Sequence, residues 1–266
     1  MDGSAGLARA IAFSVAGYPI YMARTLVQIG YEPVEPDEFG RLPSLISYIS
    51  IIRRQRGYAS LYTGIGYYLP AVILKKSSYD VMATLTDHKV ETSKCGVSEL
   101  IAVCLRESAL RIHTTLITYP LVTIGIGYIS STFFGTKETI EFTIENVYRG
   151  IVPKLIVEVT MVWVGIISRR LTVDLVDDEV GQAIVSRIPP FIVQSLLYPL
   201  NVISTVMADN GRSGVNPKFD NWRQCYGYLQ DIRQLRRGNS LFYRRNYQPV
   251  SSSNYTSYRY SVEQSA

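Results

Sequence analysis

Residues 18–33, YPIYMARTLVQIGYEP, open with a Tyr-Pro step inside a long apolar stretch, and two more such steps follow, at Tyr119-Pro120 and Tyr198-Pro199. Each step precedes a short related segment: LYTG at 61–64, VYRG at 147–150 and LFYR at 241–244. The first and third spacings, Pro19 to Gly64 and Pro199 to Arg244, are 45 residues, and the middle one is 30. Self-similarity of this kind indicates one structural unit used three times.

The predicted unit is an apolar helix, a polar loop that contains a short helix, and a second apolar helix. An apolar helical pattern follows Gly64 and Gly150, but only 22 mostly polar residues follow Arg244. The third unit therefore lacks its last helix. We expect five transmembrane helices and three short loop helices, where six long helices would close a ring.

The composition excludes several classes of site. The 266 residues carry a net charge of +5, which fits contact with anionic headgroups but does not require nucleic acid. Three cysteines, Cys95, Cys104 and Cys225, show neither a CxxC motif nor paired spacing, so we expect no disulfide framework and no zinc site. The N-terminus lacks the features of a secretory signal.

The hydropathy pattern predicts the membrane spans. A span needs about 20 mainly apolar residues. Residues 57–74, 112–136 and 188–208 contain no Asp, Glu, Lys or Arg, whereas 6–29 and 150–167 are interrupted by charges and depend on the repeat for support. A soluble helical protein with buried core helices is the alternative, since the mean hydropathy is only +0.09.

These signals divide the chain into a membrane bundle, residues 1–244, and a polar tail, 245–266, that is predicted to be disordered. The repeats cover about 1–90, 95–180 and 181–244. Long helices are expected at 6–30, 62–85, 99–130, 147–171 and 182–207, and short helices at 43–54, 137–146 and 221–234. We expect Pro19, Pro120 and Pro199 to kink the first helix of each repeat.

The repeat resembles the mitochondrial carrier superfamily, and GYASLYTG at 57–64 is the closest local match. Within the superfamily, the chain looks most like the mitochondrial carrier homologues of the outer membrane. This resemblance rests on residues 19–33, on RESALRIHTTLITYP at 106–120, on GIVPK at 150–154 followed by Glu158, and on RGNSLFYRR at 237–245. It implies an all-α membrane protein with a truncated carrier fold, multi-pass in the mitochondrial outer membrane.

The chain departs from a transporting carrier at the gate. Carriers place an acid two residues after each proline and a base five residues after it, so that three ion pairs close one side. The corresponding positions here are Tyr21 and Arg24, Val122 and Gly125, and Asn201 and Ser204. One charge of six remains, so these residues cannot form the gate. Alternating access for a small solute is therefore disfavoured.

Ionisable groups at membrane depth are costly and usually face a bundle interior or water. We expect a polar groove, open to lipid where the sixth helix is missing, lined by Arg24, Lys76, Asp80, Arg106, Glu107, Arg111, His113, Lys154, Glu158, Arg187 and Gln194. Some of these groups can instead be structural pairs or reach headgroups from helix ends. Arg24 and Glu158 are the strongest candidates for a functional role.

The resemblance implies an insertase for α-helical outer-membrane proteins, tail-anchored ones included, with lipid scrambling as a linked activity. Its partners would be membrane lipids and hydrophobic helical clients. The alternatives are a docking receptor for apoptotic or metabolic partners and, less favoured, a solute transporter. No phosphate-binding loop or esterase elbow occurs, so we expect neither nucleotide use nor an enzyme, and no cofactor.

Overall fold

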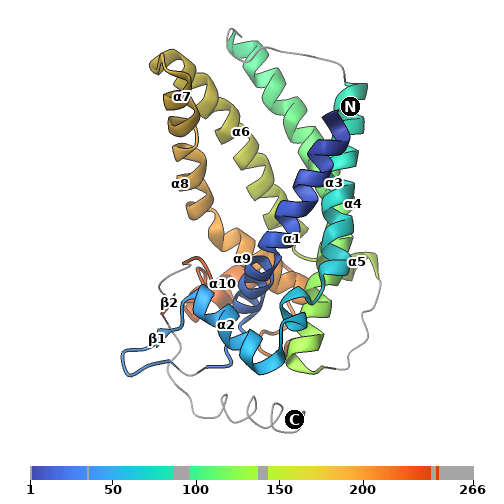
Figure 1. Ribbon diagram of the computed structural model, residues 1–266, viewed down its shortest axis with the longest axis vertical. Coiled ribbons are helices and arrows are strands. Elements are labelled where there is room, and N and C mark those ends of the chain that lie inside the picture. Colours follow the sequence, from blue (N-terminus) through green and yellow to red (C-terminus); the bar gives the residue numbers. More distant parts are fainter. Residues whose placement is uncertain (1, 35, 87–95, 137–142, 241–243, 246–266) are drawn as a thin grey trace.

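The computed structural model describes residues 2–34, 36–86, 96–136, 143–240 and 244–245, and nearly all of its regular structure is helical (Figure 1). The long helices are α1 (Asp2–Ile29), α3 (Ile65–Leu85), α4 (Val97–Phe134) and α6 (Ile151–Leu175). Shorter ones are α2 (Leu45–Arg56), a 3-10 turn (Ala59–Tyr62), α5 (Ile144–Val147), α7 (Glu179–Val185), α8 (Ile188–Leu196), α9 (Tyr198–Asp209) and α10 (Trp222–Asp231). Two short strands, β1 (Arg41–Leu42) and β2 (Arg244–Arg245), pair antiparallel. The predicted all-α class is confirmed.

The predicted fifth long helix is wrong as a single element. Residues 179–209 form α7, α8 and α9, and the axis bends by 50° where α9 begins. Pro199 lies in the first turn of α9, where its missing N–H costs nothing, but its ring would clash with a continuous helix before it. Pro19 and Pro120, in contrast, lie inside unbroken helices.

Two other predicted segments differ from the structure. The short helix expected at 137–146 is confined, among the described residues, to Ile144–Val147, and 137–142 lie outside them. The long helix expected at 147–171 is α6, which begins at Ile151 and continues to Leu175. Residues 246–266 of the predicted tail also lie outside the described part.

Three helical segments are each long and apolar enough to cross a membrane: Gly6–Ile29, Val97–Phe134 and Ile144–Val173. The bent run from α7 to α9 is a fourth when it is counted as one span. Helix α3 is 21 residues long but does not meet this criterion, because it carries Lys75, Lys76 and Asp80. The chain is a membrane protein, and five spans remain a prediction.

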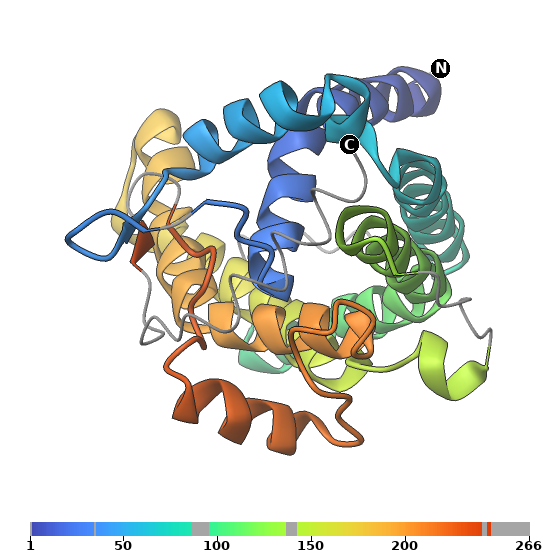
Figure 2. The ribbon, with the colours of Figure 1, turned by 90° about the horizontal axis from the view of Figure 1, so that it is seen from below.

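The helices form a ring (Figure 2). Helix α3 packs along α4, α4 along α6, α6 against α8 and α9, α9 against α1, and α1 against α3. Helices α2 and α10 lie at the lower end in the view of Figure 1, together with the two strands.

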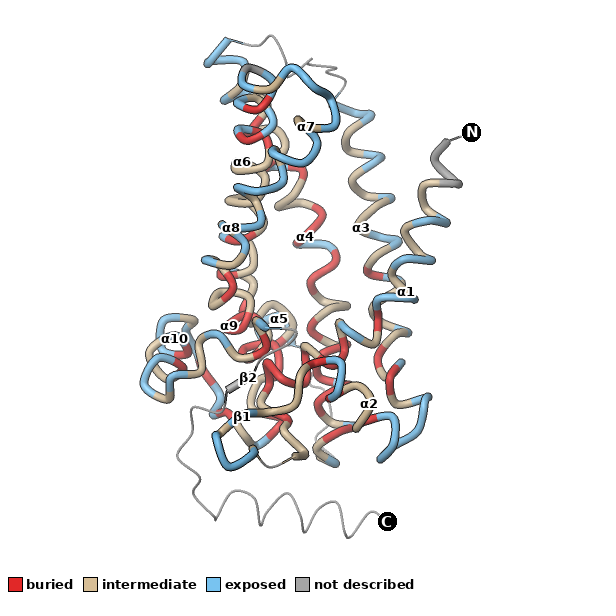
Figure 3. Tube along the Cα trace, turned by 60° about the vertical axis from the view of Figure 1, so that its left-hand side comes forward, coloured by how far each residue is buried: buried red, intermediate tan, exposed pale blue. Residues whose placement is uncertain are grey.

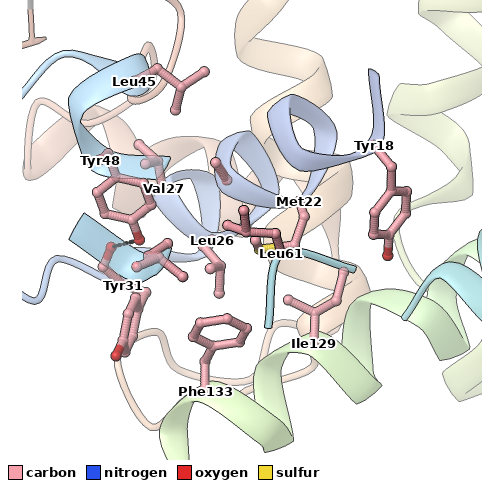
Figure 4. Packing of buried hydrophobic residues seen from close by; sticks show 12 residues of the cluster. Tyr18, Met22, Leu26, Val27, Tyr31, Leu45, Tyr48, Leu61, Ile129 and Phe133 are labelled. Carbon is pink, nitrogen blue, oxygen red and sulfur yellow. Dashed lines mark hydrogen bonds between the residues drawn. The ribbon is translucent and has the colours of Figure 1, made fainter. Parts of the chain in front are cut away.

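Burial is concentrated at this lower end (Figure 3). One apolar cluster joins α1, α2 and α4 through Met22, Leu26, Tyr48 and Phe133 (Figure 4), and the Tyr48 hydroxyl donates to the Tyr31 carbonyl at 2.7 Å. A second cluster packs α10 on α9, and burial there raises the pKa of the Cys225 thiol to about 12. That cysteine therefore stays a protonated core residue.

One contact recurs in all three repeats. The tyrosine of each Tyr-Pro step donates its hydroxyl hydrogen to the carbonyl just before a glycine: Tyr18 to Thr63, Tyr119 to Arg149 and Tyr198 to Arg237. The following glycines, Gly64, Gly150 and Gly238, have φ of 84°, 80° and 79°. A Cβ on any of them would lie 3.0–3.1 Å from the tyrosine oxygen, so the close approach requires glycine.

This contact corrects the predicted third repeat. The counterpart of Gly64 and Gly150 is Gly238, and the predicted segment 241–244 is not the match. The spacing from Pro199 is therefore six residues shorter than predicted. Residues 241–244 resemble the two earlier segments in their apolar character, but the contact requires a glycine with positive φ next to a tyrosine hydroxyl.

Candidate functional site

The strongest polar cluster surrounds Glu158 on α6. Its carboxylate lies 3.4 Å from the Lys75 ammonium, 3.5 Å from that of Lys154 and 3.7 Å from the Arg111 guanidinium. Lys154 also reaches the side-chain oxygen of Asn201 on α9, at 3.5 Å. We call Lys75, Arg111, Lys154 and Glu158 the cation cluster.

The cation cluster lies on the inner side of the ring. Its members and Asn201 come from α3, α4, α6 and α9, which are successive neighbours around the ring, and side chains from all four can meet only inside it. The side chain of Glu158 is 18% exposed, while those of the three cations are 34–38% exposed. The cations therefore keep one side open, and the cluster carries a net charge of +2.

Other predicted site residues make separate contacts on α3 and α4. The Tyr79 hydroxyl donates to Glu107 at 2.8 Å, Ser78 lies 3.4 Å from His113, and Arg106 donates to the Thr86 hydroxyl. Lys76 pairs with Asp80 on its own helix at 3.2 Å. These contacts couple α3 to α4 or neutralise charge locally, so the predicted groove residues do not form one continuous site.

A buried polar clasp joins α1 to α9, and sequence reasoning missed it. The Gln28 amide nitrogen donates to the Tyr198 hydroxyl, and its oxygen accepts from Thr205, both at 2.9 Å. Asn216 also donates to the Ile29 carbonyl at the end of α1. Gln28 carries no charge, so the charge pattern of the helices did not point to it. Its only signal in the sequence is a polar amide between apolar neighbours.

Arg24 lies one helical turn from this clasp. Its Nε is buried and has no hydrogen-bond partner, and no ion pair to it exists within the described ranges. The structure therefore separates the two strongest predicted residues: Glu158 is surrounded by cations, whereas Arg24 stands near the clasp.

No protein-family model matches the chain. The chain is 26% identical to human mitochondrial carrier homolog 2 and 24% identical to the mouse protein, over 87% of this chain and 90% of each relative. It is 23% identical to mouse mitochondrial carrier homolog 1, over 86% of the chain and 73% of that relative.

The chain is a mitochondrial carrier homologue. The resemblance inferred from the repeat is confirmed, and the chain is a mitochondrial membrane protein.

In this carrier homologue, the positions that would form a carrier gate hold packing contacts instead. Ser204 lies 3.2 Å from the Tyr119 hydroxyl, and a Cβ on Gly125 would lie 3.3 Å from that of Tyr67. The lower end of the ring is thus held by hydroxyl, amide and small-residue contacts.

Helices α1 and α8 of the homologue expose large apolar side chains. Above the clasp, the ribbons of α1 and α8 stand apart in Figures 1 and 3. On α8, Phe191, Ile192 and Leu196 are exposed, Phe191 by 74%, and Phe13 on α1 is exposed by 79%. These two apolar edges suit lipid or another helix.

Arg187 and Gln194 belong to a different place from the cation cluster. Both line an open hollow of about 520 Å³ between α6 and the α7–α8 segment, together with Arg169, Ser186 and Phe191. Arg169 was not predicted, because it lies at the end of an apolar stretch. No group of acids, histidines and cysteines able to hold a metal occurs in the part of the chain that the structure describes.

Proposed function

We propose that this carrier homologue is an insertase for α-helical membrane proteins, tail-anchored ones included, in the mitochondrial outer membrane. One observation supports the proposal above the others. A partly exposed, net positive cluster lies inside a ring in which two helices, α1 and α8, expose large apolar side chains.

Such an arrangement matches the two needs of an inserting helix. The apolar segment of a client can lie against the exposed edges of α1 and α8, while its polar flank passes the charged interior. A charged group at the bilayer centre costs at least about 2.5–3.5 kcal/mol on insertion scales. A polar path lowers this barrier without nucleotide hydrolysis. The same path would admit lipid headgroups, which makes scrambling a linked activity.

The cluster also predicts which clients pass best. A net charge of +2 attracts an acidic flank and repels a basic one, so acidic flanks should insert faster. Glu158 alone would suggest the opposite preference, but the three cations around it reverse the local sign.

The test is insertion into liposomes that contain the purified full chain, using tail-anchored clients that differ only in flank charge. We expect Lys75→Gln and Lys154→Gln to reduce the advantage of acidic flanks a few-fold, since the path holds water and has a fairly high effective dielectric constant. Lys76→Gln is the matched control, because Lys76 is already paired with Asp80. Rates are normalised to folded protein. A loss that is uniform across the client series would show that the cluster is scaffold, and no insertion by the unmodified chain would refute the proposal.

A further inference from the structure

The cation cluster is short of negative charge. Three cations share one carboxylate, and none of the three contacts, at 3.4–3.7 Å, reaches the 2.7–2.9 Å of a strong charge-assisted hydrogen bond. Unbalanced charge is costly in a bundle surrounded by lipid. The site is therefore suited to a further anion.

The cluster also has free donors. The Arg111 guanidinium faces Glu158 through Nε, and its two terminal nitrogens donate no hydrogen bond to any described residue. Among the described residues, the Lys75 ammonium has a polar interaction with Glu158 alone, so most of its donors are also available. A planar guanidinium fork beside two ammonium groups matches the several acceptor oxygens of a phosphate.

We propose that the cation cluster binds the phosphate group of an anionic phospholipid. A lipid source is favoured over soluble phosphate because Arg111, Lys154 and Glu158 lie within two helical segments that are long and apolar enough to cross a membrane, where lipid surrounds the bundle. A headgroup with a net negative charge is favoured over a zwitterionic one, because a choline would add a cation to a cluster that already has an excess of two. The binding site needs no client protein and so does not depend on the insertase activity.

The experiment is a lipid titration of the purified full chain in a neutral detergent, without client. Intrinsic tryptophan fluorescence reports the thermal midpoint, which a ligand that binds only the folded state raises. Phosphatidylglycerol, phosphatidylcholine, glycerol 1-phosphate and inorganic phosphate are compared at equal concentrations. We expect a clear rise with phosphatidylglycerol and little with the other three. Equal rises with soluble phosphates would overturn the lipid assignment, and equal rises with the two lipids would overturn the charge preference.

Variants locate the effect. Lys75→Gln, Arg111→Gln and Lys154→Gln should each weaken apparent phosphatidylglycerol binding about tenfold, as expected for the loss of one charge-assisted contact. Glu158→Gln should lower the midpoint without lipid but enlarge the rise that lipid produces, because it removes the competing carboxylate. Lys76→Gln removes a lysine on the same helix as Lys75 but outside the cluster, and it should leave the lipid-dependent rise unchanged. A purely structural cluster predicts that all four cluster variants lower the midpoint and leave the lipid-dependent rise as it is, and that result would refute the proposal.

Discussion

Gln28 shows how one uncharged residue closes the ring. Helix α1 meets α9 directly, and this contact completes the ring of described helices. The buried Gln28 amide satisfies two side chains of α9, Tyr198 and Thr205, at once. Because Tyr198 also holds the carbonyl before Gly238, the clasp connects the first helix to the end of the third repeat.

We predict that Gln28→Ala lowers the free energy of unfolding by about 1–3 kcal/mol, the usual cost of leaving buried polar partners unsatisfied. The measurement is thermal or denaturant unfolding of the purified chain in detergent. Gln194→Ala, which removes an exposed glutamine on α8, is the control and should change little. Equal effects of the two substitutions would mean that the Gln28 contacts do not hold the ring.

At the scale of elements, the repeat is defined by a contact rather than by a spacing. A tyrosine hydroxyl, a carbonyl and a left-handed glycine recur although the loops between them differ in length. The three prolines are less equivalent than the motif suggests: α1 and α4 continue through theirs, and only the third repeat breaks. That break tilts α8 away from α9 and so helps to set the position of an exposed apolar edge.

We predict that Gly150→Ala destabilises the fold by roughly 2 kcal/mol more than Gly135→Ala does, because only the methyl group at Gly150 is overpacked, and overpacking costs about 1–3 kcal/mol. Both glycines have positive φ, 80° and 69°, so the backbone penalty is shared. A Cβ at Gly150 would lie 2.7 Å from the Ser204 carbonyl, whereas nothing lies within 4 Å at Gly135. Unfolding midpoints of the two variants give the comparison, and similar losses would show that the repeat contact tolerates a methyl group.

At the scale of the whole molecule, the lower end is packed and the upper end is open. The apolar clusters, the clasp and the tyrosine–glycine contacts all stabilise the lower end, where burial is concentrated (Figure 3). The chain enters α1 at the upper end, and β2 lies at the lower end (Figure 1). Its long segments, α1, α3, α4, α6 and α7–α9, run alternately down and up.

This path predicts that the two ends of the chain lie on opposite sides of the membrane. Epitope tags at Met1 and Ala266 should therefore differ in protease protection in intact mitochondria or oriented vesicles. Accessibility of both tags after membrane lysis serves as the control. If both tags are protected, or both are cleaved, in intact membranes, the chain crosses the membrane an even number of times. Helix α3, which carries three charged residues, would then be the first segment to reconsider as a span.

The sequence by itself determined the helical class, the membrane location and the approximate ends of four long helices. These follow from local physics, because apolar length, charge and the restricted backbones of Pro and Gly act within a few residues. The sequence also predicted three repeats and a missing sixth helix. It placed the third repeat motif at 241–244, because those residues resemble the earlier segments, whereas the structure places it at Gly238.

Only the tertiary structure decided which side chains meet. Lys75 and Glu158 are 83 residues apart in the chain, and Gln28 and Tyr198 are 170 apart, so no local pattern could pair them. Packing around the ring placed three cations on one carboxylate and left Arg24 beside the clasp. The net positive charge of the cluster depends on these long-range neighbours, because its charged residues come from three different helices, α3, α4 and α6.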